Sequence, residues 1–235
     1  MGFNFTYFFD SLRSGIEYLP NTFQLTFIPI VIALFLGMVI AVIRVYRIPF
    51  LAPLLAVLIT LYQGIPLVVA LMIYHLLFIA EFNDFAAALH LGINMANMNM
   101  IWIGIFALSL HTTCYMEESI KGAFFSVDKG QYEAGYSVGL TRLQTLRRII
   151  IPQVIPVALP MLTNNIVGAI KGSSIVMVIG ITEVLAGSVV PASKTYAFFE
   201  GYIAAALIYW IFTIFVEKLA RRIEKRGDKY RRNLV

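Results

Sequence analysis

Residues 22–43 read TFQLTFIPIVIALFLGMVIAVI and contain no charged side chain. An α-helix of this length measures roughly 33 Å, which is enough to cross a hydrocarbon core of about 30 Å. The whole chain has a matching composition, since 60% of its 235 residues are hydrophobic and 13% are charged. Soluble domains have about 45–50% apolar and about 25% charged residues. The sequence therefore predicts an all-α, polytopic membrane protein.

Several stretches of the chain are free of charge over the length of a transmembrane helix. The last stretch, 201–216, is too short to cross the membrane unless residues 197–200 are included in the helix. The five predicted transmembrane helices lie within residues 18–43, 48–80, 98–116, 149–170 and 201–216. The apolar stretches 172–182 and 184–193 are too short to cross, so they predict a broken or re-entrant region covered by protein.

The basic residues are distributed unevenly between the predicted loops. If the N-terminus lies outside, the inner segments are 44–53, 117–151 and 217–235, and they hold fifteen of the 18 Lys and Arg residues. Because Lys and Arg concentrate in short cytoplasmic loops, we expect the N-terminus outside and the C-terminus in the cytoplasm. The net charge of +5 then reflects membrane orientation, and we expect no nucleic-acid partner.

Three segments follow from this pattern. Residues 1–19 combine aromatic side chains with Asp10 and Arg13 and predict an amphipathic helix at the membrane interface. A poorly ordered terminus is the alternative. Residues 20–222 form the predicted transmembrane domain, and residues 223–235 form a basic cytoplasmic tail.

The loop 117–151 is the long polar insertion on the predicted cytoplasmic side. We expect a first helix interrupted at Gly135 and Gly139, and a second helix that Thr141 caps and that ends before Pro152. Gly139 suits a turn with positive φ, in which a residue with a Cβ would be strained. Two short helices joined by such a turn predict a docking element for a soluble partner.

The same loop carries a spaced motif. Glu133-Ala134-Gly135 is followed after three residues by Gly139, and after nine more by Ile149-Ile150-Ile151-Pro152. This resembles the EAA loop of ABC importer permeases, whose pattern is E-A-A, three residues, G, nine residues and I-x-L-P. Gly135 replaces the second Ala of that pattern, and Ile151 replaces the Leu. The resemblance implies a coupling role toward an ATPase for Glu133, Ala134, Gly135, Gly139 and Arg142.

Other motifs resemble the polar amino-acid uptake subfamily of these permeases. Residues 63–69 (QGIPLVV) resemble R-G-T-P-L-L-V, residues 171–174 (KGSS) resemble part of L-K-D-T-S-L, and residues 178–185 (VIGITEVL) resemble V-I-G-x-x-E-L-L. Gln63 stands in place of the Arg in the first pattern, and Gly172 in place of the Asp in the second. The resemblance covers most of the chain and implies the type I ABC importer permease fold.

The resemblance also implies a transport subunit of an ATP-driven importer in a bacterial cell membrane, rather than an enzyme. The implied partners are a second permease subunit, identical or different, a pair of ATP-binding subunits, an extracellular or periplasmic substrate-binding protein, the lipid bilayer and an amino-acid substrate. No Gly is followed by Lys in the chain, so it lacks the Walker A motif. We therefore expect no cofactor here, and ATP and Mg²⁺ on the partner ATPase.

Polar residues inside the spans are the candidates for the substrate path, because stranded charge is costly in a bilayer. Lys171 precedes a break at Gly172, where an amino-acid carboxylate could bind; the alternative is a structural ion pair with Glu183. Because Gly172 replaces an acidic residue of the pattern, we expect a neutral or zwitterionic substrate such as glutamine or cystine. The candidate path residues are Gln63, Asn164, Lys171, Ser173, Ser174 and Glu183.

Three alternatives remain. One is an importer for a cationic amino acid, the second a secondary transporter or channel without an ATPase, and the third a membrane-embedded enzyme that uses His111. His111, Cys114 and Glu118 lie on one face of a helix. Three ligands along one helix rarely converge on one ion, so we expect no metal site.

Overall fold

The computed structural model describes residues 2–232, and every regular element in that part of the chain is a helix, as predicted. The long helices are α2 (Leu19–Val45), α4 (Leu67–Ala88), α5 (Ile101–Phe125), α8 (Ile151–Gly172) and α10 (Phe198–Arg232). The shorter helices are α1 (Phe5–Glu17), α3 (Leu51–Gln63), α6 (Lys129–Ser137), α7 (Arg142–Thr145) and α9 (Val184–Ser193). Short 3₁₀ or π segments are η1 (Met95–Asn97), η2 (Leu146–Ile150) and η3 (Ser173–Ile179).

Within the described residues, four helices are long and apolar enough to cross a membrane. They are α2, α4, the continuous helix Arg142–Ile179 that contains α8, and Phe198–Lys225 of α10. Helix α5 overlaps the third predicted span but is more polar, since it contains His111, Glu117 and Glu118. Most of α5 is buried by the neighbouring helices. The polar side chains of α5 are therefore shielded from lipid by the surrounding helices.

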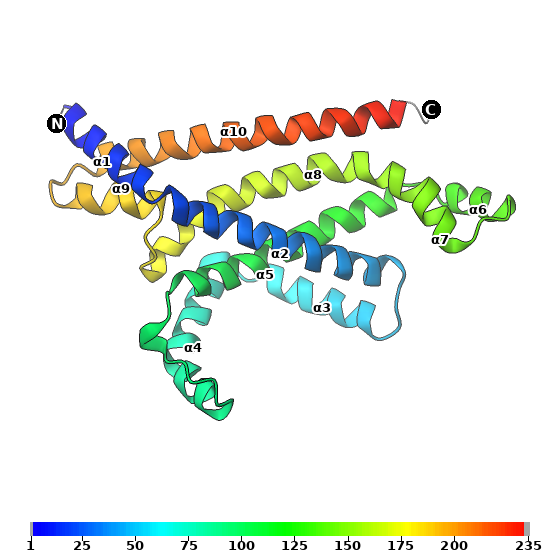
Figure 1. Ribbon diagram of the computed structural model, residues 1–235, viewed down its shortest axis with the longest axis horizontal. Coiled ribbons are helices and arrows are strands. Elements are labelled where there is room, and N and C mark those ends of the chain that lie inside the picture. Colours follow the sequence, from blue (N-terminus) through cyan, green and yellow to red (C-terminus); the bar gives the residue numbers. More distant parts are fainter. Residues whose placement is uncertain (1, 233–235) are drawn as a thin grey trace.

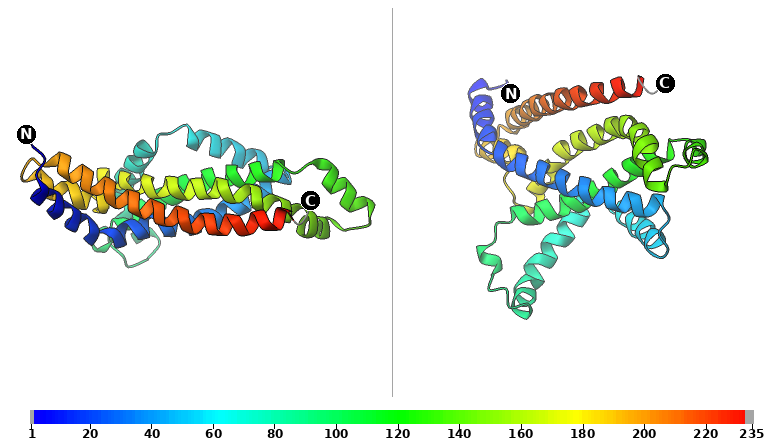
Figure 2. Two further views of the ribbon diagram at one scale, coloured as in Figure 1. Left: turned by 90° about the horizontal axis from the view of Figure 1, so that it is seen from above. Right: turned by 45° about the vertical axis from the view of Figure 1, so that its right-hand side comes forward.

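The second uncharged interval, 48–80, is not one continuous helix but is divided between α3 and α4. Helix α3 ends at Gln63, and α4 begins at Leu67 and continues past the end of the interval to Ala88. Between them stands Pro66, which lacks an N–H and disfavours a helical conformation of the preceding Ile65. Helix α4 then leaves the other helices at a steep angle (Figures 1 and 2).

The central contact of the fold is between α2 and α5, which pack along much of their length. At their close approach, a Cβ added to Gly37 would lie 3.1 Å from the backbone nitrogen of Glu117. One apolar cluster, which includes Leu25 and Leu71, joins α2 to α4, α5 and η3. A second, which includes Ile150, joins α2, α5 and α8.

The three basic segments lie at one end of the molecule. Figure 1 shows the α2–α3 connection, helices α6 and α7, and the C-terminal end of α10 together, whereas the N-terminus and α9 lie at the opposite end. We call the end that holds the α2–α3 connection, α6 and α7 the basic end. The predicted tail 223–235 is helical as far as Arg232, and its residues 233–235, like Met1 of the segment 1–19, lie outside the described residues.

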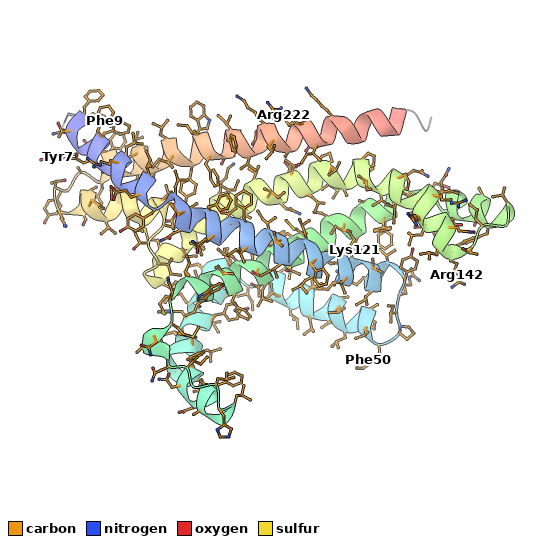
Figure 3. The ribbon with its side chains drawn as sticks, in the orientation of Figure 1. Tyr7, Phe9, Phe50, Lys121, Arg142 and Arg222 are labelled. Carbon is orange, nitrogen blue, oxygen red and sulfur yellow. The ribbon has the colours of Figure 1, made fainter. Side chains whose placement is uncertain are left out.

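Helix α1 packs on α9 and α10 through small residues. The hydroxyl of Ser14 donates to the carbonyl of Gly187 at 2.8 Å, and a Cβ added to Gly15 would lie 2.1 Å from the Oγ of Ser188. On the other face, Phe9 is exposed (Figure 3). The segment thus combines a small-residue face inside the protein with an exposed aromatic face.

Candidate functional site

Helix α6 has well-defined ends. Asp128 caps its start, because the carboxylate accepts a hydrogen bond from the N–H of Gly130 at 2.6 Å. At its end, the N–H of Leu140 donates to the carbonyl of Gly135 at 3.1 Å, and the N–H of Gly139 to that of Tyr136 at 3.0 Å. This is the Schellman arrangement, which requires a left-handed residue. Gly139 supplies it with a φ of +82°, at the position where the sequence predicted a positive-φ turn.

Three details of the predicted loop differ in the structure. Gly135 does not interrupt α6 but lies inside it, buried against α7, where a Cβ would approach the Cγ2 of Thr145 to 2.6 Å. The second helix begins at its Thr141 cap with a capping box to Gln144, but it does not end before Pro152. The π segment η2 precedes this proline, and the helix continues into α8. A proline in a helix removes one i→i−4 hydrogen bond, but a π turn does not use that bonding pattern, so Pro152 is tolerated here. The predicted loop 117–151 also overlaps α5, which ends at Phe125.

The tip formed by α6 and α7 presents a mixture of charged and apolar side chains. Glu133, Ala134 and Arg142 are exposed, and Arg142 marks this tip in Figure 3. Val138 is 75% exposed and Leu143 72% exposed. Apolar side chains at a polar tip indicate a surface that a partner protein could cover.

The base of α6 is attached to the start of α8. Tyr132 packs on the cluster that contains Ile150 and Val154, and burial raises the pKa of its phenol. The side-chain amide of Gln153 donates to the Oε1 of Gln131 at 3.1 Å. A displacement of α6 would have to break these contacts or move the start of α8 with it.

A charged cluster joins α2 to α5 near the basic end. Arg44 donates to Oε2 of Glu117 at 2.6 Å and to Oε1 of Glu118 at 2.7 Å, and Lys121 (Figure 3) donates to Oε2 of Glu118 at 2.5 Å. The side chain of Glu117 is fully buried, and that of Arg44 is 14% exposed. Such an ion pair holds the two helices in one relative position.

A pocket of about 200 Å³ lies between α5 and α8, next to the start of α4. Its ten lining residues are Leu67, Leu108, His111, Thr112, Tyr115, Asn164, Asn165, Gly168, Ala169 and Gly172. None of them is Asp, Glu, Lys or Arg. The amide of Asn165 donates to the hydroxyl of Ser119 at 2.7 Å, and the rings of His111 and Tyr115 are 4.8 Å apart. The pocket can therefore offer imidazole, amide and hydroxyl groups to a polar ligand.

Only one predicted path residue, Asn164, lines this pocket. Lys171 is exposed on α8, seven residues after Asn164 and thus on the same side of the helix. Gln63 is exposed at the end of α3. The hydroxyls of Ser173 and Ser174 donate to carbonyls of the preceding turn. The structure does not bring these residues together.

Glu183 does not pair with Lys171, which was the alternative considered for that lysine. Its Oε1 accepts hydrogen bonds from the N–H groups of Leu185 at 2.9 Å and Ala186 at 3.1 Å, so it caps α9. Its Oε2 accepts from Thr22 and from Tyr209. The fully buried carboxylate thereby joins α2, α9 and α10.

Sequence reasoning missed most of the pocket. His111 was considered only as a metal ligand or catalytic group, and Thr112 and Tyr115 were not singled out. The available signal was the polar run at 111–115 inside an otherwise apolar helix.

Comparison with known proteins decides the family. Residues 33–229 match the family described as the binding-protein-dependent transport system inner membrane component. The chain belongs to this family. The sequence-based prediction of an ABC transporter permease is therefore confirmed, and the protein is a multi-pass membrane transport subunit.

Relatives and solved structures cover this permease almost completely. It is 34% identical to the probable amino-acid ABC transporter permease protein PatM of Vibrio harveyi, over 97% of this chain and 98% of that protein. It is 30% identical to the L-cystine transport system permease protein TcyL of Bacillus subtilis, over 96% and 92%. A crystal structure of an amino acid ABC transporter with histidines matches with a TM-score of 0.78 and 31% identity, over 96% of this chain and 100% of that chain. The MetNI methionine ABC transporter, at 14% identity and a TM-score of 0.68 over 90% and 95%, shares the fold.

Proposed function

We propose that this permease imports a polar amino acid that carries no net side-chain charge, such as glutamine or cystine. The observation that carries the proposal is the pocket between α5 and α8, whose lining has hydrogen-bonding groups but no fixed charge. A cationic side chain would need an acidic partner there. Relatives whose names include amino-acid, cystine and glutamine transport support the substrate class.

The proposed topology has five spans, with α5 as the third, the N-terminus outside and the C-terminus in the cytoplasm of a bacterial cell. Its support is the position of the three basic segments at one end of the fold. In this orientation α6 and α7 face the cytoplasm, and α1 lies at the outer membrane interface.

We propose that α6 is the coupling helix. Its exposed Glu133 and Ala134, with Arg142 on α7, would contact a separate ATPase that binds ATP and Mg²⁺. Gly135 permits the close contact with α7, and Gly139 makes the turn between them. The same assembly includes a second permease subunit and an outer substrate-binding protein, as the family implies.

The substrate path runs along the side of α8 that carries Asn164 and Lys171. Asn164 would contact the substrate, and Lys171 would attract its carboxylate. Ser173, Ser174 and Gln63 lie away from the pocket, and Glu183 acts by holding α9 in place. We therefore assign substrate contact to His111, Tyr115, Asn164 and Asn165.

The test is uptake into proteoliposomes that contain the permease, its ATPase and its binding protein. Labelled L-glutamine or L-cystine should accumulate only with ATP, and neutral amino acids should compete better than arginine or lysine. His111→Leu and Asn164→Ala should lower the uptake rate by about tenfold or more, equivalent to about 1.4 kcal/mol, whereas Asn97→Ala on the exposed η1 should not. Best competition by arginine or lysine would refute the substrate class, and accumulation without the ATPase would indicate a secondary transporter.

A further inference from the structure

A second cavity, of about 400 Å³, lies between α8 and α10. Thr163 and Asn164 line it from α8, and Glu217, Arg221, Glu224 and Lys225 line it from α10. We call it the α8–α10 crevice. Its lining residues on α10 belong to the C-terminal half of that helix, which extends toward the basic end (Figure 1).

The charged groups of the crevice come from one helix and balance one another. Glu217, Arg221, Glu224 and Lys225 are spaced by four, three and one residues, which places them on one side of α10. Two carboxylates and two cations thus face the uncharged surface of α8. The crevice is therefore matched to a ligand that carries both signs of charge.

The internal contacts of the crevice leave these charges open to a ligand. The hydroxyl of Thr163 donates to Oε1 of Glu224 at 2.5 Å, which fixes that carboxylate from across the crevice. Glu217 and Arg221 are 3.6 Å apart, with side chains that are 36% and 70% exposed. Exposed pairs of this kind are weak, so a bound ligand could replace them at little cost.

We propose that the α8–α10 crevice binds the ammonium and carboxylate groups of a free amino acid, as a second station on the path. The inference rests on the proposed function. Arg221 and Lys225 would bind the carboxylate, and Glu217 and Glu224 would accept from the ammonium. Asn164 lines both cavities, so a substrate leaving the uncharged pocket would meet the crevice on the same helix.

The experiment is equilibrium binding of labelled L-glutamine and L-cystine to the permease–ATPase complex in nanodiscs without nucleotide. Wild type should show two binding components. Arg221→Gln and Glu224→Gln should each raise the Kd of one component by about tenfold or more and leave the other unchanged, whereas Arg221→Lys should keep both. The matched control is Arg222→Gln, because Arg222 is exposed on the side of α10 away from α8 (Figure 3); it should bind like wild type.

Different failures have different meanings. The crevice site would be overturned if neither of two binding components changed in Arg221→Gln and Glu224→Gln, or if wild type showed one component that these variants leave unchanged. Either result would leave the proposed substrate class intact. Absence of all amino-acid binding in wild type would overturn the substrate proposal as well. A phosphatidylethanolamine headgroup carries the same pair of charges, so nanodiscs with and without this lipid are compared. If Arg221 and Glu224 determine retention of the lipid but not amino-acid binding, the crevice is a lipid site and the proposal is wrong.

Discussion

Replacing Arg44 by Met should be among the most destabilising changes in the chain. Arg44 is the ion-pair partner of Glu117, whose side chain is fully buried, and Arg44 itself is 14% exposed. Removing one member of a buried ion pair leaves the other charge uncompensated and costs about 3–5 kcal/mol. Because so little of either side chain is exposed, we expect this full range, with a further small loss from the half-exposed Glu118.

The assay is the free energy of unfolding of the purified permease in detergent micelles, measured by titration with sodium dodecyl sulfate. Arg13→Met is the matched control, because Arg13 and Glu17 form an exposed pair whose side chains are 87% and 65% exposed; it should change the free energy by less than about 1 kcal/mol. The double variant Arg44→Met/Glu117→Gln should be more stable than Arg44→Met alone, since the stranded charge is gone. A loss below about 1 kcal/mol in Arg44→Met, or a double variant that is less stable than Arg44→Met, would refute the reasoning.

Three further changes test close contacts and the turn. Gly135→Ala should lower substrate-stimulated ATP hydrolysis, because the new methyl group overlaps Thr145, and Thr145→Ala in the same chain should restore it. Gly139→Val should abolish this stimulation while membrane insertion stays intact, because a β-branched residue at φ +82° is strained by about 1–3 kcal/mol; Gly139→Asn should retain most of it, since Asn tolerates this conformation. Gly15→Ala should lower the melting temperature through its clashes with Ser188 and Ile208, and Ser188→Gly should recover part of the loss; a Gly15→Ala permease as stable as wild type would show that α1 does not pack as described.

Features that depend on neighbouring residues in the chain could be predicted from the sequence. The all-helical class follows from long uncharged stretches, and the turn at Gly139 from a glycine next to a capping threonine. The break predicted at Gly172 is absent, because Gly172 has helical backbone angles and the helix continues through η3 to Gly180, where φ is +79°. The two successful signals each lie within a few residues of the structure that they determine.

Features that depend on helix packing could not be predicted in this way. Nothing near Gly135 in the sequence indicates that Thr145 lies against it, so the glycine was interpreted as a helix break. The buried pair of Arg44 and Glu117 joins residues that are 73 positions apart. The pocket likewise forms only where α5 meets α8, and this is why a path predicted from single polar residues contained just one member of its lining.

Coupling through α6 to a separate ATPase is the central claim, and a single pair of vesicle preparations tests it. Proteoliposomes with the permease, ATPase and binding protein are compared between wild type and Glu133→Ala, and labelled amino-acid uptake and ATP hydrolysis are measured in the same vesicles. We predict that wild type accumulates substrate with stimulated hydrolysis, whereas Glu133→Ala inserts normally but shows neither. Normal accumulation and normal stimulation in Glu133→Ala would contradict the account.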